Sequence, residues 1–174
     1  MTKPQKTIRT YKEFSPRIGS KVFIADTAVV IGDVDIGDQS SIWYNVVIRG
    51  DINSIRVGKR TNLQDGTVVH VDHEQYCVQI ADDVTIGHNA TVHGCTIESR
   101  CLIGMGATLL SGAKIESEAI VAAGSVVLEN QTVPAGTLVA GVPAKPIRNV
   151  TDAEIEKIEQ SARHYIAYAK SYMQ

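Results

Sequence analysis

Three histidines in the middle of the chain, His70, His88 and His93, are the residues best suited to chemistry. Imidazole is the commonest metal ligand in proteins, and its pKa lies near physiological pH. Three imidazoles that leave one coordination position open are typical of a catalytic zinc site, whereas structural sites are closed by four protein ligands. Whether the three rings can meet depends on the elements that carry them.

An aliphatic residue returns at every sixth position over most of the chain, with two insertions and one shortened step. These positions hold only Ile, Val or Leu: Ile18, Ile24, Val30, Ile36, Ile42, Ile48, Val57, Leu63, Val69, Ile80, Ile86, Val92, Ile97, Ile103, Leu109, Ile115, Val121, Val127, Val133 and Val139. A period of six fits neither a helix nor an ordinary strand, but it fits a short strand followed by a tight corner. The sequence therefore predicts an all-β solenoid, a left-handed parallel β-helix of hexapeptide repeats over residues 18–145.

The end of the chain has a different pattern and predicts a C-terminal α-helix over residues 151–173. Thr151 and Glu154 have the spacing of a capping box. Apolar residues then follow in steps of three and four and form one narrow face: Ile155, Ile158, Ala162, Tyr165, Ala169 and Tyr172. We expect this helix to lie along a wall of the β-helix or across a subunit boundary, within a single domain of residues 1–174. The segment before Ile18 is too irregular to place.

The composition excludes several classes of protein. The chain has 174 residues and a formal net charge of -2, without the basic surplus of a nucleic-acid or anionic-membrane binder. No apolar run approaches the ~18 residues that span a bilayer. The three cysteines form no CxxC pattern, which indicates free thiols and a cytoplasmic protein. We expect neither nucleic acid nor membrane as a partner.

The repeat places His70 and His93 in one column. Both follow aliphatic residues of the same face in successive turns, and Arg49 has the same position one turn earlier. Residues beside a core residue point outward, and stacked strands lie ~4.8 Å apart. The two imidazoles can therefore converge on one ion at the usual Zn–N distance of ~2.0–2.1 Å.

His88 belongs to the adjoining face and would reach the same ion poorly within one chain. A homotrimer with three-fold symmetry would set this face against His70 and His93 of the next copy. The same contact would bring Asp65 opposite Arg49 as an intersubunit ion pair. We therefore expect a homotrimer whose sites use two histidines from one copy and one from its neighbour. Zn²⁺ is the expected ion, and Fe²⁺ or Co²⁺ would suit the same ligands.

Several motifs resemble those of the γ-class carbonic anhydrase family: Val47-Ile48-Arg49-Gly50-Asp51, Thr61-Asn62-Leu63-Gln64-Asp65-Gly66, Val69-His70, Gly87-His88 and Val92-His93-Gly94. The resemblance extends over nearly the whole chain and is nearest to the compact bacterial branch with carnitine-operon and ferripyochelin-binding-like proteins. It implies a homotrimer with the same three histidine ligands. It also implies a carbonate dehydratase-type lyase, in which metal-bound hydroxide at the trimer interface hydrates CO₂ reversibly to bicarbonate.

The resemblance assigns roles to further residues. Gln64 would orient the hydroxide, with Asn62 beside it, and Arg49 and Asp51 would support the pocket and help to hold bicarbonate. Tyr165 resembles a tyrosine near the active site in this branch. Hydrogen bonding at the corners of a β-helix would suit Gln64, Asn62 and Asp51 equally well.

The chain departs from the best-studied members of that family in two places. Ile52 stands where they carry a glutamate, and the insertion at residues 71–79 is shorter than their acidic loop with its proton-shuttling glutamate. These departures are expected to slow turnover and leave metal binding intact. His73 or Glu74 is a candidate replacement, because histidine titrates in the required range.

Two other functions compete with CO₂ hydration. One is an acyl-group enzyme, either a metal-dependent thioesterase or an acyltransferase-like hexapeptide protein. A thioesterase needs only the same metal hydroxide and a different carbonyl. The ending Gly141-Val142-Pro143-Ala144-Lys145 is shared widely with hexapeptide acyltransferases. Hexapeptide acetyltransferases usually need a long loop over the acyl-CoA pocket, and no insertion here is long enough. The other is a non-catalytic trimeric scaffold that keeps the metal for assembly.

Overall fold

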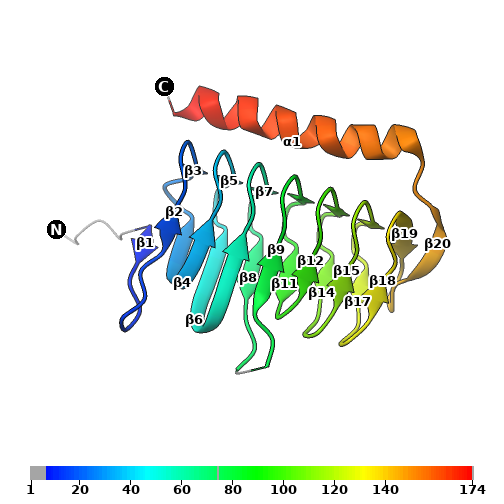
Figure 1. The fold of residues 1–174 in the computed structure, drawn as a ribbon, viewed down its shortest axis with the longest axis horizontal. Helices are drawn as coiled ribbons and strands as arrows, with labels where there is room; N and C mark the ends of the chain where they lie inside the picture. Colours follow the sequence, from blue (N-terminus) through cyan, green and yellow to red (C-terminus); the bar gives the residue numbers. More distant parts are fainter. Residues whose placement is uncertain (1–6, 74, 174) are drawn as a thin grey trace.

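The computed structural model describes residues 7–73 and 75–173 and confirms the β-helix of hexapeptide repeats. Short parallel strands stack into a prism, and one helix lies along its length (Figure 1). The three walls of the prism are called faces A, B and C here. In every turn of the β-helix the chain covers faces A, B and C one after another. Residues about one turn apart in the sequence therefore become neighbours on the same face.

Face A is an eight-stranded sheet that lies next to the helix. Its strands, in spatial order, are β3 (Phe23–Ile24), β5 (Ser41–Ile42), β7 (Asn62–Leu63), β10 (Thr85–Ile86), β13 (Leu102–Ile103), β16 (Ile120–Val121), β19 (Thr137–Ala140) and β20 (Lys145–Asn149). All pairs are parallel except the last, in which β20 returns antiparallel to β19.

Faces B and C form one twelve-stranded sheet, because the long strands β4 (Val29–Ile36) and β6 (Val47–Val57) continue from one face to the other. Face B continues from them through β8 (Val68–His70), β11 (Thr91–His93), β14 (Thr108–Leu109) and β17 (Val126–Val127). Face C contains β2 (Arg17–Ile18) and continues through β9 (Val78–Ile80), β12 (Thr96–Ile97), β15 (Lys114–Ile115) and β18 (Thr132–Val133).

Close contact between the two long strands depends on a glycine. Gly32 has φ +81°, and a Cβ at this position would lie 2.1 Å from the carbonyl oxygen of Gly50. A side chain would therefore push the two strands apart directly before Asp51, which is one of the predicted site residues.

The segment before Ile18 is placed only by the structure. Strand β1 (Ile8–Arg9) pairs in parallel with Val30 and Ile31 of β4. This strand lies at the edge of its sheet, with half-exposed side chains, so it does not need the aliphatic repeat that marks the strands around the core.

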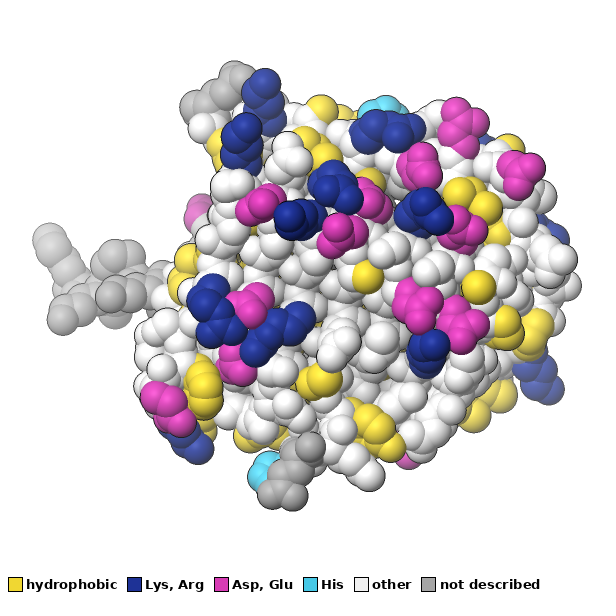
Figure 2. All heavy atoms as spheres, viewed as in Figure 1, with side chains coloured by type: hydrophobic (Ala, Val, Ile, Leu, Met, Phe, Trp, Pro, Cys, Tyr) yellow, Lys and Arg dark blue, Asp and Glu magenta, His cyan; other side chains and the backbone are white. Residues whose placement is uncertain are grey.

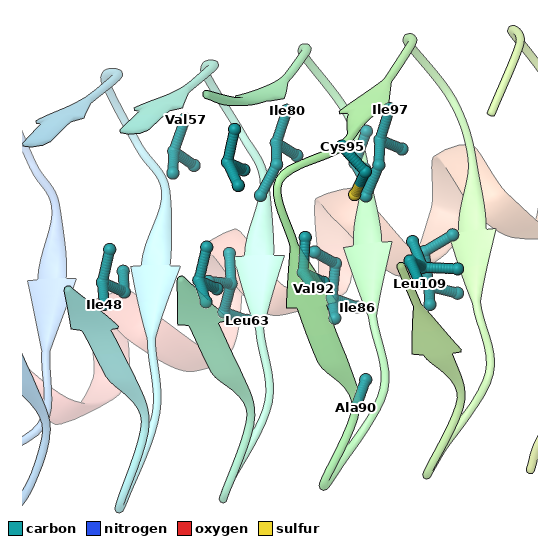
Figure 3. Close-up of a cluster of buried hydrophobic side chains, with 14 of the residues drawn as sticks. Ile48, Val57, Leu63, Ile80, Ile86, Ala90, Val92, Cys95, Ile97 and Leu109 are labelled. Atoms are coloured by element: carbon teal, nitrogen blue, oxygen red, sulfur yellow. The ribbon is translucent and has the colours of Figure 1, made fainter. Parts of the chain in front are cut away.

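The core consists of the aliphatic residue of each repeat. Ile48, Leu63, Ile86 and Val92 are fully buried and form layers inside the prism (Figure 3). Neighbouring corners contribute small side chains such as Ala90, which leaves room for one large aliphatic side chain per wall.

Truncating one of these core side chains is expected to lower the stability of the fold substantially. Ile86→Ala should lower the free energy of unfolding by about 2–5 kcal/mol, because it removes buried methyl groups and leaves a cavity. Ile147→Ala is the matched control, since Ile147 is 61% exposed on β20. Urea denaturation of both variants checks this. Equal losses in the two variants would contradict the assignment of Ile86 to the core.

Helix α1 (Asp152–Tyr172) confirms the predicted C-terminal helix and its capping box. The Thr151 side chain accepts a hydrogen bond from the backbone of Glu154, and the Glu154 side chain accepts one from the backbone of Thr151. The helix packs on face A through Ile158, Ala162 and Ala169. It runs back toward the N-terminal end of the prism (Figure 1). Within the described part of the chain, we find no helix whose length and apolar character would let it cross a bilayer.

The outer surface of face C carries ion pairs between successive turns. Asp35 lies in register between Arg17 and Arg56 and pairs with both. Acidic and basic side chains lie next to one another across the surface seen in Figure 2. This surface is therefore balanced in charge within the chain.

Candidate metal centre

The predicted column of Arg49, His70 and His93 is present on face B. Arg49 of β6 is in register with His70 of β8, which is in register with His93 of β11. The residue before each of them is a fully buried aliphatic one, so the strand pleat turns these three side chains outward.

Two nitrogen atoms of this column face each other at a distance that suits a metal ion. His70 Nδ1 lies 3.3 Å from His93 Nε2. Two nitrogens that share a tetrahedral zinc ion at ~2.0–2.1 Å each lie about 3.3 Å apart. The donor pair therefore fits one edge of a tetrahedral site.

The second nitrogen of each ring has a neighbouring side chain as its partner. His70 Nε2 lies 3.1 Å from Asp51 Oδ1, and His93 Nδ1 lies 2.9 Å from Ser111 Oγ. Such partners fix the tautomer and the orientation of metal-binding histidines. Ser111 was not among the predicted site residues, although it follows His93 by 18 residues, about one turn of the repeat, and this spacing could have indicated the contact.

Burial favours the metal-binding form of His70. Burial lowers the pKa of His70 and so favours the neutral ring that binds metals. Burial by itself would raise the pKa of Asp51, but hydrogen bonds from Arg49 and His70 outweigh it and lower this pKa. Asp51 is therefore ionised and accepts from both neighbours, with Arg49 Nη1 at 2.5 Å from its Oδ2.

His88 lies at the corner between faces A and B, beside Asp65 of the preceding turn. Its Nδ1 is 2.9 Å from Asp65 Oδ2, and both side chains are about 40% exposed. Its Nε2 is the nitrogen left for a ligand. Among residues 7–73 and 75–173, no three His, Cys, Asp or Glu side chains gather into a metal-binding group. Within one chain, the candidate centre thus has two histidines.

The Arg49–Asp65 ion pair would join two copies of the chain, and it stays a prediction. In the single chain, Arg49 pairs with Asp51 and Asp65 pairs with His88. Both Arg49 and Asp65 are partly exposed, so a second copy has access to them.

Gln64 and Asn62 lie on face A beneath helix α1. Gln64 Nε2 donates to Asn62 Oδ1 at 3.2 Å, and Asn62 Nδ2 donates to Thr85 Oγ1 at 2.9 Å. All three side chains are buried. Gln64 also lines one pocket with His88, and the remaining wall of that pocket is mostly apolar. The structure therefore brings Gln64 near the third histidine.

Tyr165 lies in an aromatic cluster between helix α1 and the first turns. Its ring centroid is 5.5 Å from that of Trp43, and it lines a small pocket with Asp65. Burial and the charge of Asp65 raise the pKa of Tyr165. The hexapeptide repeat did not predict this contact, because Trp43 lies at a corner, outside the repeated aliphatic positions.

His73 lies in the second insertion and lines an open pocket together with Asp51 and Ile52. It is thus near the partner of His70 but outside the column. The other candidate shuttle, Glu74, lies outside the described residues. The role of either residue stays a prediction.

Comparisons with known proteins agree with this architecture. The bacterial transferase hexapeptide (six repeats) family model matches residues 15–50 and 94–129. A hexapeptide transferase family protein from Anaplasma phagocytophilum has the same fold, with a TM-score of 0.92, 42% identity and coverage of 95% of this chain and 98% of that one.

Several curated relatives are named as carbonic anhydrases, and two of them serve as examples. Gamma carbonic anhydrase 2, mitochondrial, of Arabidopsis thaliana is 48% identical over 170 residues, which is 95% of this chain and 61% of that protein. This chain thus spans about three fifths of the plant relative. The carbonic anhydrase of Geobacillus kaustophilus is 41% identical over 165 residues, 95% of this chain and 90% of that protein. From this identity over nearly the whole chain, we conclude that the protein belongs to the gamma carbonic anhydrase family.

Proposed function

We propose that this chain assembles as a homotrimer and converts CO₂ and bicarbonate into each other at metal sites shared by neighbouring copies. The observation that carries the proposal is the 3.3 Å approach of His70 Nδ1 and His93 Nε2, each on a ring whose other nitrogen has a partner. The third histidine lies at another corner, with one ring nitrogen held by Asp65. Such a centre needs a second copy to complete its ligands.

The metal would be held by His70 and His93 of one copy and by His88 of the next. When bound, it supplies a Lewis acid that makes water a nucleophile near neutral pH. Zn²⁺ is the proposed ion, and Fe²⁺ and Co²⁺ accept the same donors. Asp51, Ser111 and Asp65 keep the three rings in the ligating orientation.

The other site residues would handle the substrate and its product. Gln64 offers an amide beside His88, where it can hold a water hydrogen and leave the lone pair of that water for CO₂. Arg49 is the positively charged member of the column and would attract bicarbonate, an anion that suits a guanidinium group. Tyr165 lies at the edge of this site, where it lines a pocket together with Asp65.

A reducing compartment suits the cysteines, and we propose a cytoplasmic location. Cys77, Cys95 and Cys101 are free thiols. Burial raises the pKa of Cys95 and Cys101 to about 12, so their thiols are unreactive at neutral pH.

The function is tested by stopped-flow CO₂ hydration on wild-type protein of known metal content, alongside acyl-CoA hydrolysis. We expect CO₂ hydration that rises in proportion to bound metal, stops on chelation and returns with Zn²⁺. Acyl-CoA hydrolysis without CO₂ hydration would instead identify a thioesterase. Full metal content with neither activity would identify a scaffold.

A further inference from the structure

A chain of side-chain hydrogen bonds connects helix α1 to Gln64. Gln64 donates to Asn62, and Asn62 donates to Thr85 of the next turn on face A. Thr85 Oγ1 then lies 3.1 Å from Ser161 Oγ, in the middle of the helix. Asn62 and Thr85 are almost fully buried, at 1% and 2% exposure, so water does not compete for their hydrogen bonds.

The residue types of Gln64, Asn62 and Thr85 do not by themselves decide in which direction this series of hydrogen bonds donates. A hydroxyl can donate or accept, and a primary amide can exchange the places of its oxygen and nitrogen. In the reverse direction Thr85 would donate to Asn62, and Asn62 would donate to Gln64. Gln64 would then turn its NH₂ group, a donor, away from Asn62.

The positions of the amide atoms give the direction, since Asn62 turns Nδ2 toward Thr85 and Oδ1 toward Gln64. Thr85 has only one hydroxyl hydrogen, which is then left for Ser161 Oγ. Without the Ser161 hydroxyl, this hydrogen would lack an acceptor and would favour the reverse direction, in which Thr85 donates to Asn62.

We infer that Thr85 and Ser161 are positioning residues that keep Gln64 Oε1, an acceptor, turned toward the pocket shared with His88. Helix α1 thereby contributes to the site, although none of its residues lies in the histidine column. An acceptor at this point holds a water hydrogen, and an NH₂ group would not. The use of that acceptor in CO₂ hydration rests on the proposed function; its orientation does not.

The orientation is tested by NMR on the side-chain NH₂ group of Gln64, assigned by its loss in Gln64→Met. In the wild type these hydrogens are expected to exchange slowly with solvent, because Nε2 donates to a buried oxygen. Ser161→Ala is expected to speed this exchange by about three- to tenfold, the effect of one lost hydrogen bond. Ser161→Thr keeps the hydroxyl and should restore slow exchange. Ser171→Ala is the control on the same helix, because Ser171 Oγ donates to the Tyr168 carbonyl instead.

The kinetic measurement uses the same variants. Ser161→Ala should lower kcat for CO₂ hydration by about three- to tenfold, with KM and metal content unchanged. Unchanged Gln64 exchange in Ser161→Ala, or the same change in Ser171→Ala, overturns the inference. A wild type without CO₂ hydration overturns the proposed function instead, and the NMR measurement still decides the orientation.

Discussion

His93→Ala is expected to lower the metal content from about one ion per chain to less than a tenth of that. The rate of CO₂ hydration should fall by more than about a thousandfold, because the water that the metal activates is lost with it. The variant changes one of the three proposed ligands, on a partly exposed surface column, so the fold should persist. Elemental analysis and stopped-flow kinetics on the same preparation check both effects.

The control for this variant is His164→Ala. His164 is exposed on helix α1, where its ring lies 6.3 Å from that of Tyr168. This change should leave both metal content and activity at the wild-type level. Full metal content in His93→Ala would contradict the assignment of His93 as a ligand.

Mixed trimers of His88→Ala and His93→Ala are expected to regain activity that neither variant has alone. In the proposed trimer, every interface of either variant alone would lack one ligand. In a mixed trimer, an interface is complete where the His88→Ala chain supplies the pair on face B and its neighbour, the His93→Ala chain, supplies His88. Random assembly from equal amounts makes about a quarter of the interfaces complete.

Metal content and CO₂ hydration of the co-expressed chains, each relative to wild type, measure this recovery. The matched control mixes His70→Ala with His93→Ala. Both of these changes lie in the same column, so no interface regains the full set of ligands. Recovery only in the first mixture supports a site between copies. Full metal content in pure His88→Ala trimers would show that one chain holds the ion without His88.

The elements that the sequence predicted share a local and repetitive cause. Each turn must bury one aliphatic residue per wall, and this requirement appears directly as the period of six. The same repeat was enough to align His70 with His93, because parallel strands in a stack keep equivalent residues in register. The capping box at Thr151 is equally local, since both of its hydrogen bonds lie within four residues.

The partners of these residues depended on the tertiary structure. Ser161 meets Thr85 across a distance in the sequence that no repeat encodes. Ser111 lies one turn after His93, but the repeat does not decide which polar side chain of that turn meets the ring. The insertions before and after His70 have no periodic pattern, so only the folded chain brings Asp51 against His70. The sequence alone thus determined which backbone positions stack, because core burial imposes a period. Which polar side chains meet was decided by the tertiary structure, because hydrogen bonds depend on the local path of corners and on the packing of helix α1.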